Sequence, residues 1–173
     1  TLSDVGVPVA DGALYKEGSQ SIDLSDRDGY LRTMVNLSSD FPFKSGSTND
    51  DFTFCAWIYF DAFPSTSGYR ARIFDIWSSG TNAILVSAKN TGSDTQMSFM
   101  QSSDGSDSEE FLHGTALTLS RWYHVAASYN NTTKAYKLRI WDDTAGALLG
   151  GGEVTGTTTN NVYMSSNAYF YIS

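Results

Sequence analysis

Hydrophobic and polar residues alternate along most of this 173-residue chain, in short runs separated by clusters of Gly, Ser, Asn, Asp and Thr. Alternation with a period of two places successive side chains on opposite faces of a strand, while such clusters favour turns. Helical periodicity is almost absent. The pattern predicts about eleven strands. They span residues 19–25, 29–35, 51–60, 71–78, 83–89, 96–102, 109–114, 122–130, 135–143, 147–156 and 168–173.

The stretch SRWYHVAASYNNTTKAYKLRIWDD, residues 120–143, is dense in aromatic residues. Its first strand has an apolar face that we predict to be core, made of Tyr123, Val125, Ala127 and Tyr129. The opposite face carries Trp122, His124, Ala126 and Ser128. In the second strand the core side holds Leu138 and Ile140, and the other side holds Lys137, Arg139 and Trp141. The segment NNTTKA predicts the hairpin loop between them, because Asn tolerates a left-handed backbone.

Many strands joined by short links predict an all-β fold, an antiparallel β-sandwich of the jelly-roll kind. Residues 26–29 are expected to form the turn between the first two strands, and residues 37–50 an irregular connection, because Pro42 interrupts strand pairing. The run Gly150–Gly152 indicates a bulged strand edge, since patterned strand sequence continues on both sides. We see no domain boundary, so residues 1–173 are predicted to form a single domain.

The segments DFTFCAWIYFDAFPS, RARIFDIW and TLSRWYHVAASYNNTTKAYKLRIWDD, with SIDLSDRDGYL near the start, resemble the laminin-G-like jelly-roll domains of the concanavalin-A-like lectin and glucanase superfamily. Residues 52–60 and 121–143 match closely, and the resemblance extends by strand order over roughly residues 19–173. It implies a laminin-G-like sandwich with carbohydrate as the default ligand class. It supports the fold more strongly than the function, because one fold hosts many functions.

The resemblance also implies a closing strand after NAYFYIS, which such domains place beside their first strand. Here the sequence ends at Ser173, so the expected fold lacks that strand. Either the sequence is a piece of a longer chain, or a partner covers the open sheet edge with its own strand.

Charge and composition narrow the possible partners. Eleven Lys and Arg against nineteen Asp and Glu give a formal net charge of -8, which repels a phosphate backbone, so no nucleic acid partner is expected. No stretch approaches the ~20 apolar residues of a membrane span, so no membrane insertion is expected. The single cysteine, Cys55, forbids an internal disulfide and lies in an apolar run, where a thiol usually packs as a small hydrophobe.

Catalytic chemistry has little support in the sequence. Glycoside hydrolysis needs two carboxylates on one face of a groove. Glu109 and Glu110 are adjacent, as are Asp142 and Asp143, so the members of each pair point to opposite faces of a strand. The two histidines accompany no serine in a nucleophile-elbow pattern. We therefore predict a protein that is not an enzyme.

Carbohydrate sites combine an exposed aromatic ring with polar side chains, because sugars have apolar ring faces and polar edges. Aromatic residues at strand ends and basic residues beside a polar loop are the candidates here. They are Trp77, Trp141, Tyr69, Arg70 and Arg72.

Calcium is the one cofactor that we expect. The resemblance puts a structural calcium near the first predicted hairpin, where the carboxylates of Asp23, Asp26 and Asp28 lie close together in the sequence. Carboxylate oxygens are preferred calcium ligands. The same residue types also make a good turn, which is the alternative explanation for them.

These features predict a non-catalytic module that mediates adhesion or glycan binding outside a cell, at a cell surface or on a virus particle. Its expected partners are a glycan or other protein subunits, including further copies in a homo-oligomer. The alternative is a structural subunit of a filament, surface layer or virus particle, whose open sheet edge is completed by a partner. A glycan-cleaving enzyme is a third and weaker hypothesis.

Overall fold

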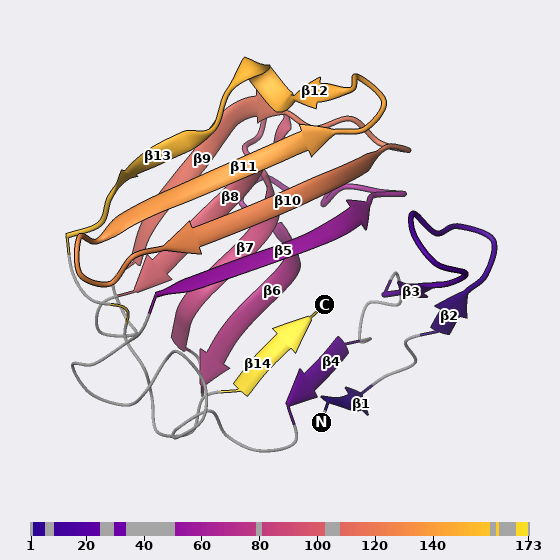
Figure 1. Ribbon diagram of the computed structural model, residues 1–173, viewed down its shortest axis with the longest axis horizontal. Coiled ribbons are helices and arrows are strands. Elements are labelled where there is room, and N and C mark those ends of the chain that lie inside the picture. The colour runs from indigo at the N-terminus through magenta and orange to yellow at the C-terminus, as the bar shows by residue number, and fades with distance from the viewer. Residues whose placement is uncertain are drawn as a thin grey trace.

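The computed structural model describes residues 2–5, 9–24, 30–33, 51–78, 81–102, 108–159, 162 and 169–172. Within them the chain forms two antiparallel sheets that pack face to face, as Figure 1 shows, and a small two-stranded sheet beside one end. The predicted all-β sandwich is confirmed. Among the described residues no helix has the length and hydrophobicity needed to cross a membrane.

The larger sheet has seven strands in the order β1-β4-β14-β6-β7-β8-β9. They are β1 (Leu2–Val5), β4 (Tyr30–Thr33), β14 (Tyr169–Ile172), β6 (Arg70–Ser78), β7 (Thr81–Asn90), β8 (Thr95–Ser102) and β9 (Ser108–Ala116). The consecutive strands β6 to β9 form a meander, because each is joined to the next by a short connection.

The smaller sheet has five strands, with β10 between β5 and β11. They are β5 (Phe52–Tyr59), β10 (Trp122–Tyr129), β11 (Ala135–Asp142), β12 (Ala147–Leu148) and β13 (Val154–Thr157). The last two both pair with β11, and the 3-10 turn η1 (Leu149–Gly151) separates them. Two further strands, β2 (Val9–Asp11) and β3 (Ser21–Asp23), pair only with each other among the described strands.

The core lies between the two sheets and follows the predicted alternation. Tyr123, Val125, Ala127 and Tyr129 are at most 2% exposed, and Leu138 and Ile140 are fully buried. Aromatic pairs join the two layers: Phe54 stacks on Phe74 at 4.2 Å between ring centroids, and Phe111 stacks on Tyr136 at 3.9 Å. Each such pair stabilises the sandwich by about 0.5–1.5 kcal/mol beyond the burial of its area.

Two predictions about strand pairing are wrong. The segments around residues 19–25 and 29–35 do not form a hairpin, because β3 pairs with β2 while β4 pairs with β1 and β14. The open edge expected beside the last strand is also not found, because β14 is hydrogen-bonded to β4 on one side and to β6 on the other. The chain thus fills this position of the sheet with its own residues 169–172.

The glycine run differs in detail from the bulged strand that we predicted. Gly150 and Gly151 adopt positive φ angles of 62° and 78°, so the backbone turns out of the sheet between β12 and β13. A Cβ on Gly150 would clash with the hydroxyl oxygen of Thr115, and its positive φ also favours glycine. The strand predicted over residues 147–156 is therefore two short strands.

Candidate functional site

The outer face of the five-stranded sheet carries the side chains of β5, β10 and β11 that point away from the core. We call this surface the outer face. Its residues lie in cross-strand rows, because the three strands are in continuous register. From one end to the other, the rows are Tyr59 with Trp122, then Trp57 with His124 and Trp141, then Cys55 with Ala126 and Arg139, and then Thr53 with Ser128 and Lys137.

The first two rows form an aromatic surface. Tyr59 and Trp122 are 5.4 Å apart between ring centroids, and Trp57 contacts the ring of His124 edge-on at 5.1 Å. All of these side chains are half-buried, so each ring leaves part of its surface to solvent. The histidine that the sequence places between aromatic residues is therefore part of a packed cross-strand row, where aromatic pairs stabilise sheets.

An N-terminal segment covers one side of this aromatic surface. Residues 9–24, which contain β2 and β3, lie near the end of the sheet where β5 finishes (Figure 1). Lys16 Nζ stands 4.8 Å from the centroid of the Trp57 ring, and Trp57 Nε1 donates a hydrogen bond of 3.2 Å to Glu17 Oε1. Lys16 also pairs with Asp143 at 2.5 Å. We call residues 9–24 the strap.

Trp141 differs from its neighbours because its ring makes no aromatic contact and its indole nitrogen no hydrogen bond with any described residue. It is half-buried, between His124 of β10 and Leu148 of β12 in the register of the sheet. A ring held by its strand but free of ring partners can accept an apolar ligand surface. Of the residues predicted to bind carbohydrate, Trp141 is the one on the outer face.

Two of the three side chains in the third row are small. Cys55 and Ala126 have small side chains, and Cys55 is exposed, contrary to the prediction that it packs as a buried hydrophobe. Arg139, at the end of this row, is also exposed. The sequence alternation had already placed Arg139 on the same side as Trp141, but its partners depend on the fold.

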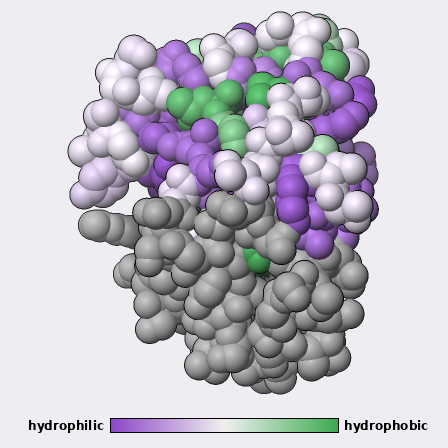
Figure 2. All heavy atoms as spheres, turned by 90° about the vertical axis from the view of Figure 1, so that its left-hand side faces the viewer, coloured by the Kyte–Doolittle hydropathy of each residue, from purple (hydrophilic) through white to green (hydrophobic). Residues whose placement is uncertain are grey.

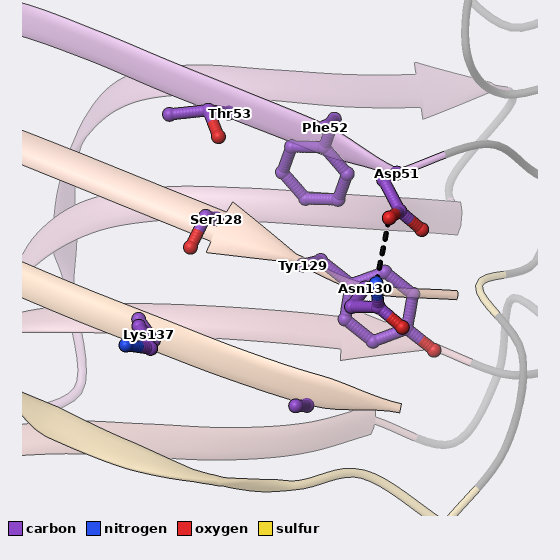
Figure 3. Close-up of a pocket in the computed structure, with 8 residues that line it drawn as sticks. Asp51, Phe52, Thr53, Ser128, Tyr129, Asn130 and Lys137 are labelled. Carbon is purple, nitrogen blue, oxygen red and sulfur yellow. Dashed lines mark hydrogen bonds between the residues drawn. The ribbon is translucent and has the colours of Figure 1, made fainter. Parts of the chain in front are cut away.

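The fourth row ends in a hollow of about 340 Å³ (Figure 3). Three neighbouring strands supply Thr53, Ser128 and Lys137, the residue before β5 is Asp51, and the hairpin loop supplies Asn130. Asn130 Nδ2 donates a 2.6 Å hydrogen bond to Asp51. The described surface at this end of the molecule is mostly hydrophilic, with hydrophobic patches between the polar residues (Figure 2).

The hairpin loop beside this hollow is fixed by its own side chains. Asn130 Oδ1 accepts hydrogen bonds of 2.8 Å from both the backbone nitrogen and the hydroxyl of Thr133. Lys134 has the positive φ of 60° that closes the loop, and its Nζ donates to the carbonyl of Asn131 at 2.7 Å. The predicted hairpin loop is present, with Asn130 bonding its own turn, but the left-handed conformation falls on Lys134 and not on an Asn.

The other predicted carbohydrate-binding residues lie on the opposite sheet. Tyr69, which is 65% exposed, precedes β6, and Arg70, Arg72 and Trp77 lie within β6. The side chain of Trp77 is outside the part of the chain that the structure describes. The fold therefore separates this group from Trp141 by the thickness of the sandwich.

Arg70 belongs to a charged cluster on β6 to β9. It pairs with Glu110 at 2.7 Å, and Lys89 pairs with the same carboxylate at 2.6 Å. Burial alone would raise the pKa of Glu110, but hydrogen bonds from Lys89, Ser98 and Arg70 outweigh it and hold that pKa below its ordinary value. These contacts bind Arg70 to the protein itself.

Arg72 pairs with Asp75 at 2.7 Å, and its own side chain is 44% exposed. Burial raises the pKa of Asp75, and the charge and hydrogen bond of Arg72 oppose that rise. Asp75 and Glu110 belong to one cross-strand row through Leu85 and Met100, three strand spacings or ~14 Å apart. That distance exceeds the ~5–10 Å between the carboxylates of glycosidases.

Glu109 points away from Glu110, as predicted. Its carboxylate accepts hydrogen bonds from Gln101 and from the backbone and hydroxyl of Thr159. Burial would raise its pKa, but these hydrogen bonds lower it below the ordinary value. Glu109 and Glu110 thus bond β9 to neighbouring residues on opposite faces of the sheet.

The residues predicted to bind calcium lie only partly within the described structure. Asp23 lies at the end of β3, opposite Val9. Asp26 and Asp28 lie outside the described residues. Across the described parts of the chain, no three His, Cys, Asp or Glu side chains gather in a way that could hold a metal ion. Calcium at these three residues stays a prediction.

Two antiparallel sheets with this connectivity define the class as a lectin-like and glucanase-like β-sandwich. A laminin-G family profile, described as the concanavalin A-like lectin/glucanases superfamily, matches residues 28–164, and the chain belongs to this family. No curated relative matches the sequence.

Two solved structures are similar in fold. The full-length tailspike protein 2 from Escherichia coli O157:H7 bacteriophage CAB120 aligns with a TM-score of 0.57 at 12% identity, over 95% of this chain. The chain spans 22% of the tailspike's length. The native heptameric SAP-like pentraxin from Limulus polyphemus aligns with a TM-score of 0.47 at 16% identity, over 83% of this chain and 56% of the pentraxin.

Proposed function

We propose that this chain is a non-catalytic module that binds glycans on the outer face of its five-stranded sheet. The observation that carries the proposal is Trp141, a half-buried ring on this face with no aromatic partner among the described residues. Sugar rings stack on such an indole through their apolar face, and their hydroxyls need polar groups at the rim.

The dimensions of the outer face suit a short stretch of polysaccharide. Successive rows are two residues apart along the strands, so the four rows extend over about 20 Å. Small side chains at Cys55 and Ala126 leave room above the middle of the sheet. The polar residues of the hollow, including Ser128 and Lys137, lie beyond that room and offer hydrogen bonds to sugar hydroxyls.

We further propose that the module acts outside a cell or on a particle surface. The superfamily of lectins and glucanases supports this, as does the net charge of -8, which favours solubility. The similar fold found in a phage tailspike is a second support, limited to the fold by its 12% identity. The competing hypothesis of a subunit completed by a partner strand loses its main support, because β14 is paired on both sides.

Binding to immobilised polysaccharides, followed by oligosaccharide titration, tests the proposal. Two single substitutions compare the two sheets: Trp141→Ala on the outer face and Tyr69→Ala beside β6, the latter a matched loss of an exposed aromatic ring. We expect Trp141→Ala to weaken binding about 5- to 150-fold, since ring stacking contributes about 1–3 kcal/mol to comparable contacts. Tyr69→Ala should bind as the parent does.

Two results would contradict the proposal. If no immobilised polysaccharide retained the protein, glycan binding would be ruled out as its function. Loss of binding in Tyr69→Ala, with Trp141→Ala unaffected, would move the site to the seven-stranded sheet.

A further inference from the structure

Arg139 is unusual among the basic residues because it has no partner. Its guanidinium makes no hydrogen bond or ion pair within the described parts of the chain. Every other Lys or Arg side chain that the structure describes has a carboxylate or carbonyl partner. These residues are Lys16, Arg70, Arg72, Lys89, Arg121, Lys134 and Lys137.

The position of Arg139 leaves its guanidinium accessible. On one side it is opposite Ala126, whose methyl group cannot bond to it. On the other side, β12 pairs with Trp141 and Asp142 and β13 pairs with Ala135 to Leu138, so Arg139 faces the turn between these strands. That turn contains Gly151 and Gly152, where even a Cβ would meet no atom within 4 Å. The turn thus places two glycines beside this exposed cation, and the Glu153 carboxylate that follows them is paired with Lys137.

Arg139 and Trp141 form a pair suited to one kind of sugar. They are two residues apart on β11 and point to the same face, so their Cα atoms are ~7 Å apart. A pyranose ring stacked on Trp141 can direct a substituent over that distance toward the guanidinium. The planar guanidinium donates two parallel hydrogen bonds to a carboxylate.

We propose that the outer face recognises acidic sugars, with the sugar ring on Trp141 and its carboxylate on Arg139. This inference rests on the proposed glycan-binding function and names its ligand class. Uronic acids and sialic acids share the required chemistry.

The surrounding charges favour an isolated carboxylate over a dense polyanion. Lys16 and Lys137 are already paired, with Asp143 and Glu153, so neither supplies an additional free cation. A heavily sulfated chain needs several unpaired basic residues, and among the described basic side chains of the outer face only Arg139 is unpaired. One unpaired Arg matches one carboxylate.

Titration with matched probes tests this inference. The probes are an oligogalacturonate, an oligosialic acid, the carboxyl-reduced form of each, and a sulfated glycosaminoglycan. We expect at least one acidic probe to bind, and its carboxyl-reduced form to bind about 10- to 100-fold more weakly, which is the usual effect of losing a charge-assisted hydrogen bond. The two acidic probes distinguish uronic from sialic acid.

Three variants identify the residue responsible. Arg139→Gln should lose as much affinity as carboxyl reduction does, and Arg139→Lys should lose part of it, because a lysine keeps the charge without the planar pair of donors. Lys89→Gln is the control, since it removes one positive charge from the opposite sheet while its partner Glu110 keeps Arg70. It should change affinity less than about threefold.

The possible failures can be told apart. Equal binding of an acidic probe and its reduced form, an unaffected Arg139→Gln variant, equal losses in Arg139→Gln and Lys89→Gln, or preference for the sulfated probe would each overturn the acidic-sugar inference. In these cases the proposed function stands if Trp141→Ala still loses binding. Absence of binding to every acidic, reduced and neutral glycan would overturn both.

Discussion

Lys16 covers one face of the Trp57 indole, with its Nζ 4.8 Å from the ring centroid, while it also pairs with Asp143. This contact fastens the strap to the outer face. It also explains why Trp141, and not Trp57, is the ring available to a ligand.

Replacing Lys16 should expose the Trp57 ring. We expect Lys16→Ala to cost about 1 kcal/mol or less in unfolding free energy, because partly exposed ion pairs and cation–π contacts each contribute about 0.5–1 kcal/mol. Acrylamide should quench indole fluorescence more strongly in this variant. The control places Lys16→Ala in a Trp57→Phe background, where the increase should vanish. Equal quenching with and without Lys16 would mean that the strap does not cover the ring in solution.

His113 should make the protein less stable in mild acid. Its side chain is only 9% exposed, and burial lowers its pKa below the ordinary 6.5, more than contact with the Gly152 backbone raises it. The unfolded chain therefore takes up the proton first as the pH falls. The stabilising contribution is complete above about pH 6.5 and is lost as the pH falls from there through the folded-state pKa.

Urea unfolding between pH 8 and pH 5 measures this effect. In His113→Gln, which cannot titrate, the decline in unfolding free energy over this range should be smaller than in the parent. An identical decline in both proteins would assign the pH dependence to other groups.

Gly156 should not tolerate a side chain. A Cβ there would lie 2.7 Å from the Tyr136 hydroxyl and 2.9 Å from its ring, and that ring is buried and stacked on Phe111. Gly156→Ala should therefore cost about 1–3 kcal/mol, the usual effect of overpacking. Gly152→Ala is the control, because its Cβ would meet nothing within 4 Å. Denaturant midpoints that fall equally in the two variants would contradict the packing around Tyr136.

Cys55 offers a test of the outer face that needs no substitution. It is the only cysteine, it is exposed, and it shares a row with Ala126 and Arg139. A glycan on this face should slow modification of the thiol by a maleimide several-fold. Protein from which the glycan has been removed should react at the rate of the free protein. A rate unchanged at saturating glycan would place the ligand elsewhere.

Calcium binding near Asp23, Asp26 and Asp28 is tested by thermal unfolding with calcium and with EDTA. Calcium at a concentration of 100 times the Kd of its site raises the unfolding free energy by about 2.7 kcal/mol. We expect calcium to raise Tm in the parent chain and to leave the triple variant Asp23→Asn, Asp26→Asn, Asp28→Asn unchanged. If calcium does not shift the parent's Tm, these residues act only as a turn.

The sequence predicts the sandwich well where patterning is local. Alternation in residues 122–141 assigned Val125 and Leu138 to the core and Trp141 to the outer face, because a period of two leaves no other arrangement in a strand. The first hairpin was predicted wrongly for a related reason. A turn signal between two strands is local, whereas β4 pairs with β14, whose residues lie far away in the sequence.

The candidate site was only partly predictable. Trp141 was identified, but Tyr69, Arg70 and Arg72 could not be assigned to the other sheet from their composition. The free guanidinium of Arg139 depends on the turn at Gly151 and on the partners that occupy other basic residues. The contact of Lys16 with Trp57 joins residues far apart in sequence, and no local pattern indicates it.

Chemical-shift mapping tests glycan binding by the outer face most directly. In two-dimensional amide spectra titrated with a retained oligosaccharide, we predict shifts at Ala126, Arg139 and Trp141, including the Trp141 indole signal, and little change around Tyr69. Shifts confined to β6 to β9, with the outer face unchanged at saturation, would contradict it.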